Sequence, residues 1–185
     1  MYKHCISQPA KARQRQLEAG LLAYMARHPY ESIVISDLCD YLEIPRKSFY
    51  RYFSNKDGAL YALIDHTLVD FIDVFFKNGA VVTATMSEDF FKYWLTKKDL
   101  LRILAHSNLH GLLVQRAIDM AMKDTEYVPA LFSEVPKDMR DHVLLFVLTG
   151  IMSLLAQWEK EDFRRSPKEM AKITLTILNE SLFTI

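Results

Sequence analysis

The sequence predicts an all-α protein. Five Gly and six Pro among 185 residues are few for the many tight turns of an all-β fold, and Leu, Ala, Met, Lys and Glu, which favour helices, are common. Apolar residues also recur at helical spacing along most of the chain. About nine helices are expected, divided between an N-terminal three-helix domain at 1–55 and a larger helical domain at 56–185.

Composition favours a folded protein of the cytoplasm. Half of the residues are apolar and a quarter are charged, which is ordinary for a globular chain. The apolar run at 143–156 is interrupted by small and polar residues and is too short to span a bilayer, and the polar N-terminus has no apolar signal core. Cys5 and Cys39 are expected to be reduced and structural. No membrane partner and no cofactor are expected.

The first four helices are expected at 11–27, 37–42, 46–53 and 56–77. The first has apolar residues on one face and stops at Pro29. Ser36 is a good N-cap for the second helix. Pro45 suits the start of the third, because its fixed φ is helical and its missing N–H is no loss there. Ser54 or Asn55 is expected to cap the fourth helix.

The second half of the chain is also helical but more apolar. Helices are expected after Ser87, at 97–105, from Ser107 or Asn108 to about 123, at 138–159 and at 168–181, with a loop at 124–137. Thr96 and Ser166 are the expected N-caps of two of them. Helix 138–159 is apolar nearly all round, which predicts burial on more than one side.

Charge and aromatic residues single out the N-terminal domain. Residues 1–58 carry nine Lys and Arg against six Asp and Glu, a net charge of +3, whereas the remainder carries 14 against 17, or −3. Two short helices joined by a short turn form the helix-turn-helix arrangement that reads DNA. The second of them carries side chains able to hydrogen-bond phosphates or base edges: Arg46, Lys47, Ser48, Tyr50, Arg51 and Tyr52. The alternative is a solvated basic face on a core helix.

The segment Val34 to Ile64, VISDLCDYLEIPRKSFYRYFSNKDGALYALI, resembles the DNA-binding signature of the TetR family of transcriptional regulators. The resemblance implies that an all-helical domain for ligand binding and dimerisation follows the DNA-binding domain. It also implies a repressor that a small molecule releases from a palindromic operator. The partners would then be double-stranded operator DNA, a second copy of the chain and a small-molecule effector.

Carried over residue by residue, the resemblance places Arg46, Lys47 and Ser48 in the major groove. Tyr50 and Tyr52 would contact phosphates. Phosphate contacts are also expected of Lys56, at the N-terminus of the fourth helix, and of Ser36, and Arg51 completes the DNA-binding set. The rings of Phe49 and Phe53 are expected to face the core of the small domain.

The sequence departs from the family pattern at two positions. Glu43 stands where the inter-helix turn usually has glycine, so this residue either adopts a left-handed conformation, at a cost of about 1 kcal/mol, or the turn has another shape. Lys47 stands where a small residue is usual, so the base preference of relatives does not transfer to this chain.

The larger domain contains candidates for two further surfaces. A dimer that binds operator DNA needs two recognition helices about 34 Å apart. Helices 138–159 and 167–181 are the expected dimer surface. The expected interface residues are Val147, Gly150, Ile151, Leu154, Trp158, Ile173 and Ile177. An apolar cavity with a few polar groups suits a small molecule. The expected lining is Phe71, Phe75, Phe91, Trp94, His106, His110, Met120 and Phe146.

The sequence gives less support to a metal site, an enzyme or a partner-binding protein. His106 and His110 share a helical face, as two metal ligands would, but no third ligand has suitable spacing, so no metal is expected. No nucleophile elbow, P-loop, dinucleotide fingerprint or HExxH motif indicates an enzyme. A protein that binds a ligand or partner, with a helix-turn-helix that does not read an operator, remains the alternative. Glu43 is the feature that favours it.

Overall fold

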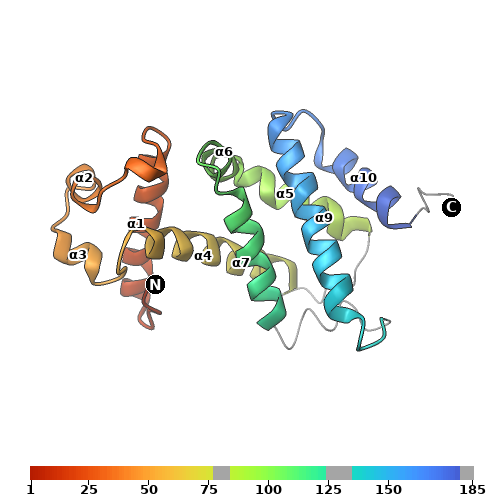
Figure 1. The fold of residues 1–185 in the computed structure, drawn as a ribbon, viewed down its shortest axis with the longest axis horizontal. Coiled ribbons are helices and arrows are strands. Elements are labelled where there is room, and N and C mark those ends of the chain that lie inside the picture. The colour runs from red at the N-terminus through yellow and green to blue at the C-terminus, as the bar shows by residue number, and fades with distance from the viewer. Residues whose placement is uncertain (77–83, 124–134, 180–185) are drawn as a thin grey trace. The chain divides into compact units, whose positions relative to one another are not determined.

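The computed structural model describes residues 1–76, 84–123 and 135–179 (Figure 1). Within these ranges the chain forms nine α-helices, one short 3-10 helix and no sheet, which confirms the all-α prediction. The chain divides into two compact units, one of residues 1–68 with 106–108 and one of residues 69–105 with 109–185. The division falls within the fourth helix, whereas the sequence placed a boundary before it.

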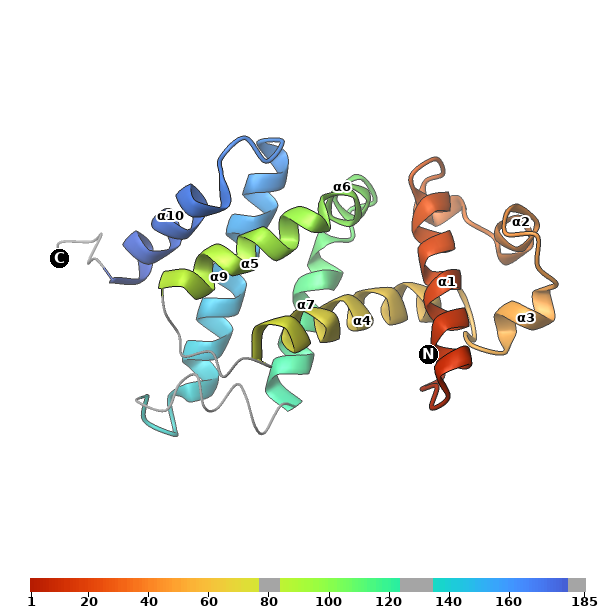
Figure 2. The ribbon, with the colours of Figure 1, turned by 180° about the vertical axis from the view of Figure 1, so that it is seen from behind.

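The first unit contains the expected three helices and the start of the fourth. They are α1 (Gln8–Met25), a 3-10 turn (Tyr30–Ser32), α2 (Ile35–Tyr41), α3 (Arg46–Tyr50) and α4 (Lys56–Phe76), shown from both sides in Figures 1 and 2. Each large apolar side chain that is removed from water contributes about 1.5–3 kcal/mol. The fully buried ones are Leu21, Leu38, Phe49, Phe53, Leu60 and Ile64.

Gly20 lets the end of α2 approach α1 closely. A Cβ atom at Gly20 would lie 2.4 Å from Cδ2 of Leu42, which is closer than two carbon atoms can pack. Any side chain at position 20 would therefore displace Leu42, the residue that leads from α2 into the turn before α3. The Leu42 side chain thus occupies the space that a larger residue at position 20 would need, and it would have to shift to admit one.

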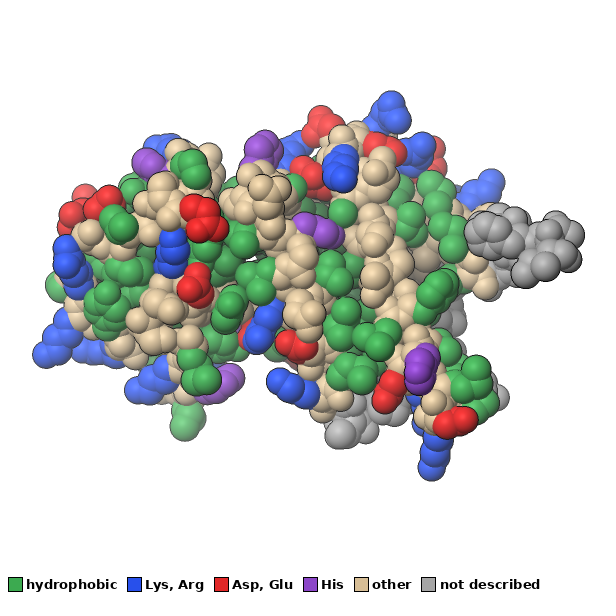
Figure 3. Space-filling model, in the orientation of Figure 1, with side chains coloured by type: hydrophobic (Ala, Val, Ile, Leu, Met, Phe, Trp, Pro, Cys, Tyr) green, Lys and Arg blue, Asp and Glu red, His purple; other side chains and the backbone are tan. Residues whose placement is uncertain are grey.

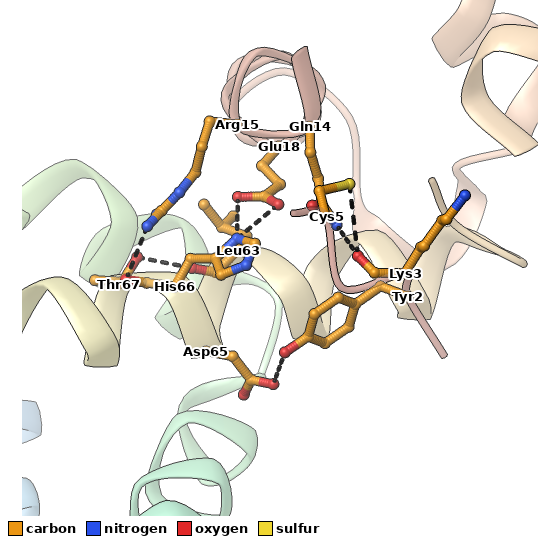
Figure 4. A network of polar contacts seen from close by, with 10 residues as sticks. All are labelled: Tyr2, Lys3, Cys5, Gln14, Arg15, Glu18, Leu63, Asp65, His66 and Thr67. Carbon is orange, nitrogen blue, oxygen red and sulfur yellow. Dashed lines mark hydrogen bonds and ion pairs between the residues drawn. The ribbon is translucent and has the colours of Figure 1, made fainter. Parts of the chain in front are cut away.

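The N-terminal segment contacts α1 and α4, as Figure 4 shows, and it also bonds to the turn after α3. The amide of Lys3 donates to the carbonyl of Tyr52 at 2.9 Å, and the side-chain amide of Gln14 donates to the carbonyl of Lys3 at 3.0 Å. The hydroxyl of Tyr2 donates to Asp65 of α4 at 2.7 Å. The segment therefore contacts α1, the turn after α3 and α4.

A buried carboxylate joins α1 to α4. Glu18 is only 1% exposed, and its two oxygens lie 2.9 and 3.0 Å from Nδ1 of His66 (Figure 4). A carboxylate in such a place is costly unless it is paired. The pair therefore sets the position of the first half of α4 against α1, in addition to the apolar packing between them.

The second unit is built from the end of α4 and five further helices. They are α5 (Ala84–Thr96), α6 (Lys98–His106), α7 (His110–Lys123), α9 (Arg140–Lys160) and α10 (Pro167–Asn179). Helix α10 packs along α5, and α7 packs along α9, as both ribbon views show. Two tryptophans hold this core: Trp94 is 1% exposed and Trp158 is fully buried. The indole N–H of Trp158 donates to the carbonyl of Arg165 at 2.9 Å.

Two of the predicted caps are confirmed and two are wrong. The carbonyl oxygen of the Asn55 side chain accepts from the amide of Gly58 at 2.8 Å, and Ser166 and Glu169 form a reciprocal capping box at the start of α10. Ser36 lies inside the first turn of α2, which begins one residue earlier. Thr96 ends α5, and its hydroxyl donates back to a carbonyl of that helix.

Helix α9 differs from its prediction. Its buried residues form one stripe, Leu144, Met152, Leu155 and Trp158, so it is not buried on more than one side of the protomer. With 21 residues it is long and apolar enough to cross a membrane, although core helices of soluble proteins have the same character. Only 22% of its most apolar window is buried. A large apolar surface of α9 is therefore exposed in the protomer.

Candidate DNA-binding surface and effector cavity

The turn between α2 and α3 has the geometry of a Schellman motif. The amide of Ile44 donates to the carbonyl of Cys39 at 3.0 Å, and the amide of Glu43 donates to the carbonyl of Asp40 at 3.1 Å. This pair of bonds requires a left-handed residue after the C-cap. Glu43 occupies that position with φ 53°. The acid therefore takes the place of the usual glycine without changing the type of turn, and of the two alternatives that the sequence left open the left-handed conformation is the one observed.

Helix α3 presents a basic and phenolic surface. Arg46, Lys47, Tyr50 and Arg51 are exposed, with Tyr50 at 53%. In Figure 3, Lys and Arg side chains gather at the edge of the molecule where Figure 1 shows α3. On the other side of the helix Phe49 is fully buried and its ring lies 5.2 Å from that of Phe53. The expectation that these two rings face the core is confirmed.

The remaining candidates on and beside α3 are less accessible. Ser48 is half-buried, and Tyr52 is only 9% exposed and packs beside Phe53. Tyr52 therefore lies in the core, and little of its surface is left for a phosphate. Ser36 is half-buried, and its hydroxyl donates to Asp37 at 3.0 Å. Sequence spacing alone did not predict that Tyr50 is exposed and Tyr52 buried, because α3 ends at Tyr50 and the chain turns before Tyr52.

Lys56 begins α4 but its ammonium is engaged by the protein. Nζ donates to the carbonyls of Tyr30 and Glu31 at 2.9 and 3.0 Å and lies 4.8 Å from the Tyr30 ring centroid. The Tyr30 hydroxyl donates to Asp57 at 2.5 Å. Burial, and then the hydrogen bond to Asp57, raise the pKa of Tyr30 well above its ordinary value. Lys56 therefore joins the 3-10 turn to α4.

The second unit contains an apolar cavity of about 360 Å³. It opens between the C-terminal half of α4, the start of α5 and one face each of α9 and α10. Its lining is Phe71, Met86, Ser87, Phe90, Phe146, Val147, Gly150, Ile151, Ser153, Leu154, Thr174, Ile177 and Leu178. A volume of this size lies within the range of small-molecule sites.

Only part of the predicted pocket lines this cavity. Phe71 and Phe146 do, whereas Phe91 and Trp94 are buried in the core of the unit. Met120 is a half-buried residue of α7, outside the lining. The side chain of Phe75 lies outside the described residues. The prediction chose rings by type, and ring type does not distinguish a residue that fills the core from one that borders a void.

The two predicted histidines have separate environments. His106 ends α6 and is exposed, and His110 begins α7 half-buried with Nε2 3.2 Å from the carbonyl oxygen of Met152. Burial is the main cause that lowers the pKa of His110. Neither histidine lines the cavity. Among the described residues no group of three or more His, Cys, Asp or Glu side chains is placed to hold a metal ion.

Most of the predicted dimer residues border the cavity. Val147, Gly150, Ile151, Leu154 and Ile177 all line it, whereas Trp158 is buried inside the protomer and is not available to a partner. Ile173 is half-buried and is not part of the lining. The two predicted surfaces therefore meet on one face of α9 and α10.

Sequence reasoning missed some of the lining, mainly Met86, Phe90 and Leu178. Ser153 and Thr174 were also missed. On α9 the helical repeat from Phe146 through Gly150 to Ser153 was the available signal, since residues three and four apart share a face. On α5 no comparable signal existed, because its place beside α10 is a tertiary contact.

The comparisons with known proteins agree with this arrangement. Residues 83–180, more than half of the chain, match the TetR-family model described as a transcriptional regulator C-terminal region. Among solved structures the chain resembles the fatty acid degradation regulator FadR from Bacillus halodurans, with a TM-score of 0.60 and 15% identity over 98% of this chain and 100% of that one. At that identity the likeness is one of fold. No curated protein sequence matches significantly.

The family match covers most of the second unit, and the first unit carries the helix-turn-helix with its exposed basic face. The chain therefore belongs to the TetR family and is a ligand-responsive, DNA-binding transcriptional regulator.

Proposed function

We propose that the chain works in the cytoplasm as a homodimeric repressor that leaves a palindromic operator when a small molecule binds, and that it is not an enzyme. The observation that carries the proposal is the exposed surface of α3. Arg46 and Lys47 stand at its N-terminal end, beyond the turn at Glu43, and Phe49 anchors the opposite side of the helix in the core. This is how a recognition helix is held so that its first residues reach base edges.

The side chains of α3 indicate which residues would contact bases and which would contact phosphates. Arg46 and Lys47 would read the major groove, where a bidentate Arg contact to guanine contributes about 1–3 kcal/mol of discrimination. Tyr50 and Arg51, further along the exposed surface, would bind phosphates and position the helix. Ser36, Ser48, Tyr52 and Lys56 would have smaller parts, because each is at least half-buried.

Dimerisation is supported by the exposed apolar residues of α9 and α10. Phe146 is 71% exposed and Ile177 is 43% exposed, and Gly150 has nothing within 4 Å of where its Cβ would stand. Apolar surface of this kind marks an association site. A two-fold dimer would present two copies of α3 to successive turns of the duplex, about 34 Å apart.

Release of DNA requires a ligand that binds one conformation of the dimer better than the other. The cavity in the second unit is the site offered for that ligand, because three helices of the matched C-terminal region, α5, α9 and α10, form it together with the adjoining α4. Binding there would change the spacing of the two DNA-binding units and lower operator occupancy.

The test begins with a palindrome selected from a randomised DNA library by the purified protein. Fluorescence anisotropy should then show tight binding to this palindrome and weak binding to its scrambled sequence across a series of salt concentrations. Lys47→Glu should abolish the preference, whereas Lys98→Glu, an exposed residue of α6, should not. Equal binding of both DNAs with the same salt slope would contradict the proposal.

A partner-binding protein without operator recognition is the alternative. Glu43 was the feature that favoured it, but Glu43 adopts the left-handed conformation that the turn requires. The alternative would regain support if Lys47→Glu left DNA affinity unchanged.

A further inference from the structure

We propose that the cavity bordered by α4, α5, α9 and α10 binds an uncharged, apolar effector. This inference rests on the proposed function, and it adds the chemical class of the ligand.

The lining contains no ionisable side chain among the residues that the structure describes. Nine of its thirteen residues are Phe, Met, Val, Ile or Leu, and the others are Gly150, Ser87, Ser153 and Thr174. A carboxylate, phosphate or ammonium group placed there would lose its hydration without gaining a counter-charge from these side chains. The composition therefore selects against ions and favours hydrocarbon.

Two of the three hydroxyls already donate within their own helices. Ser153 donates to the carbonyl of Thr149 at 2.7 Å, and Thr174 donates to the carbonyl of Met170 at 3.0 Å. Their oxygens can still accept, but they offer no proton to an anionic ligand. An effector with a single neutral donor, such as an alcohol, is compatible with this pattern, whereas a carboxylate needs donors that the two groups do not provide.

The volume limits the ligand to a compact molecule. About 360 Å³ lies near the lower end of the range of about 300–1,000 Å³ for small-molecule sites. A medium-length alkyl chain or a small aromatic compound fits this space.

The rim of the cavity lies on the apolar face proposed for dimerisation. Phe146, Ile177 and Leu178 are 71%, 43% and 48% exposed and all border the opening. A second copy packed on this face would enclose the ligand and remove it from water. Binding of an apolar effector is then coupled to dimerisation, because the same residues contact both.

The experiment uses the full chain and the neutral fluorophore N-phenyl-1-naphthylamine, whose emission rises in apolar surroundings. The competitors are decan-1-ol and decanoate, which share a chain length and differ in charge at neutral pH. Decan-1-ol should displace the fluorophore at a concentration at least about tenfold lower than decanoate, because only the anion must be desolvated without a partner. Equal or better displacement by decanoate would overturn the inference.

Variants locate the site on the protein. Leu154→Gln introduces an amide into the lining, and Leu145→Gln makes the same change on α9 outside the lining. Val147→Phe fills the cavity without adding polarity. Leu154→Gln and Val147→Phe should weaken fluorophore binding at least about tenfold, whereas Leu145→Gln should change it less than about twofold. Unaltered binding by Val147→Phe, with unfolding temperature retained, would place the fluorophore elsewhere and overturn the inference.

A second copy could itself fill the cavity. Fluorophore binding is therefore measured across protein concentrations that span dimer formation, followed by sedimentation. Expulsion of the fluorophore as dimers form would overturn the inference. Failure of the proposed function is distinguished by DNA anisotropy. If decanoate binds better and releases DNA, the repressor proposal stands and only the ligand class is wrong. If the unliganded protein shows no operator preference, the repressor proposal is wrong whatever the fluorophore does.

Discussion

The amide of Ile44 lies 3.0 Å from the carbonyl oxygen of Cys39, and this hydrogen bond closes α2 around a left-handed Glu43. The geometry places α3 directly after the turn, with Pro45 as its N-cap at φ −62°. The position of the recognition helix therefore depends on a backbone conformation that most side chains disfavour.

Glu43→Gly should stabilise the protein. A left-handed L-residue costs about 1–2 kcal/mol, and glycine loses about 0.5–1 kcal/mol more entropy on folding, so the net gain in unfolding free energy is roughly 0.5–1 kcal/mol. Chemical denaturation measures it. The control, Asp40→Gly, lies within α2 and should lower stability by about 0.3 kcal/mol, the difference between the helix propensities of Asp and Gly. A loss of stability in Glu43→Gly would show that the Glu43 side chain itself stabilises the turn.

The two tyrosines at the end of the recognition segment should differ in their effect on DNA binding. Tyr50 is 53% exposed and Tyr52 is 9% exposed. Tyr50→Phe should weaken operator binding by about 0.5–1.5 kcal/mol, the net contribution of a typical hydrogen bond. Tyr52→Phe should leave affinity within about 0.5 kcal/mol. Anisotropy titration at fixed salt measures both, and a larger loss for Tyr52→Phe would reverse the assignment of these phenols.

A charge on the exposed face of α9 should separate the dimer. Phe146→Asp places a carboxylate in the proposed interface and should cost at least about 2 kcal/mol of association free energy. Sedimentation velocity should show a monomer where the parent chain is dimeric. Met122→Asp, on an exposed position of α7, makes a similar change away from that face. A dimer that survives Phe146→Asp but not Met122→Asp would move the interface to α7.

His110 should make folding stability depend on pH. Burial lowers its pKa in the folded protein, while the unfolded chain keeps the ordinary value of about 6.5. The unfolded state therefore binds the extra proton first, so stability is intact above this value and is lost as the pH falls below it. Thermal unfolding from neutral to mildly acidic pH should show a smaller fall in His110→Gln. An identical fall in both proteins would assign the effect to other groups.

The sequence predicted helices better than it predicted their ends. Helix α10 begins where Ser166 and Pro167 indicated, because the signal there is a local capping box. The cap expected at Thr96 failed because α5 continues through this residue and its hydroxyl bonds back to the same helix. At the junction of α5 and α6 the Thr96 hydroxyl can bond either to its own helix or to the start of the next one. The packing of the two helices decides which bond forms.

Most of the exposed residues of α3 could be predicted from the sequence. Alternation of phenylalanine with basic and polar residues over a few helical positions separates a core face from a solvent face, and Phe49 and Phe53 were assigned correctly. Tyr52 is less exposed than the sequence indicated, since α3 ends at Tyr50 and helical spacing no longer applies beyond it, and its contact with phosphate stays a prediction. Lys56 was assigned to phosphate by its place at a helix N-terminus, but two carbonyls from the preceding 3-10 turn hold its ammonium.

By itself, the sequence determined that this chain is all-α and that a basic helix-turn-helix precedes a larger helical domain, because periodicity, caps and charge are properties of neighbouring residues. It also determined that position 43 would need a left-handed backbone if the turn were kept. Only the tertiary structure decided which rings border a cavity and which fill the core. Phe146 and Trp158 lie on the same helix, yet one is 71% exposed and the other fully buried. Trp158 packs against Phe91 of α5, with ring centroids 5.4 Å apart, and such a contact joins segments far apart in the chain.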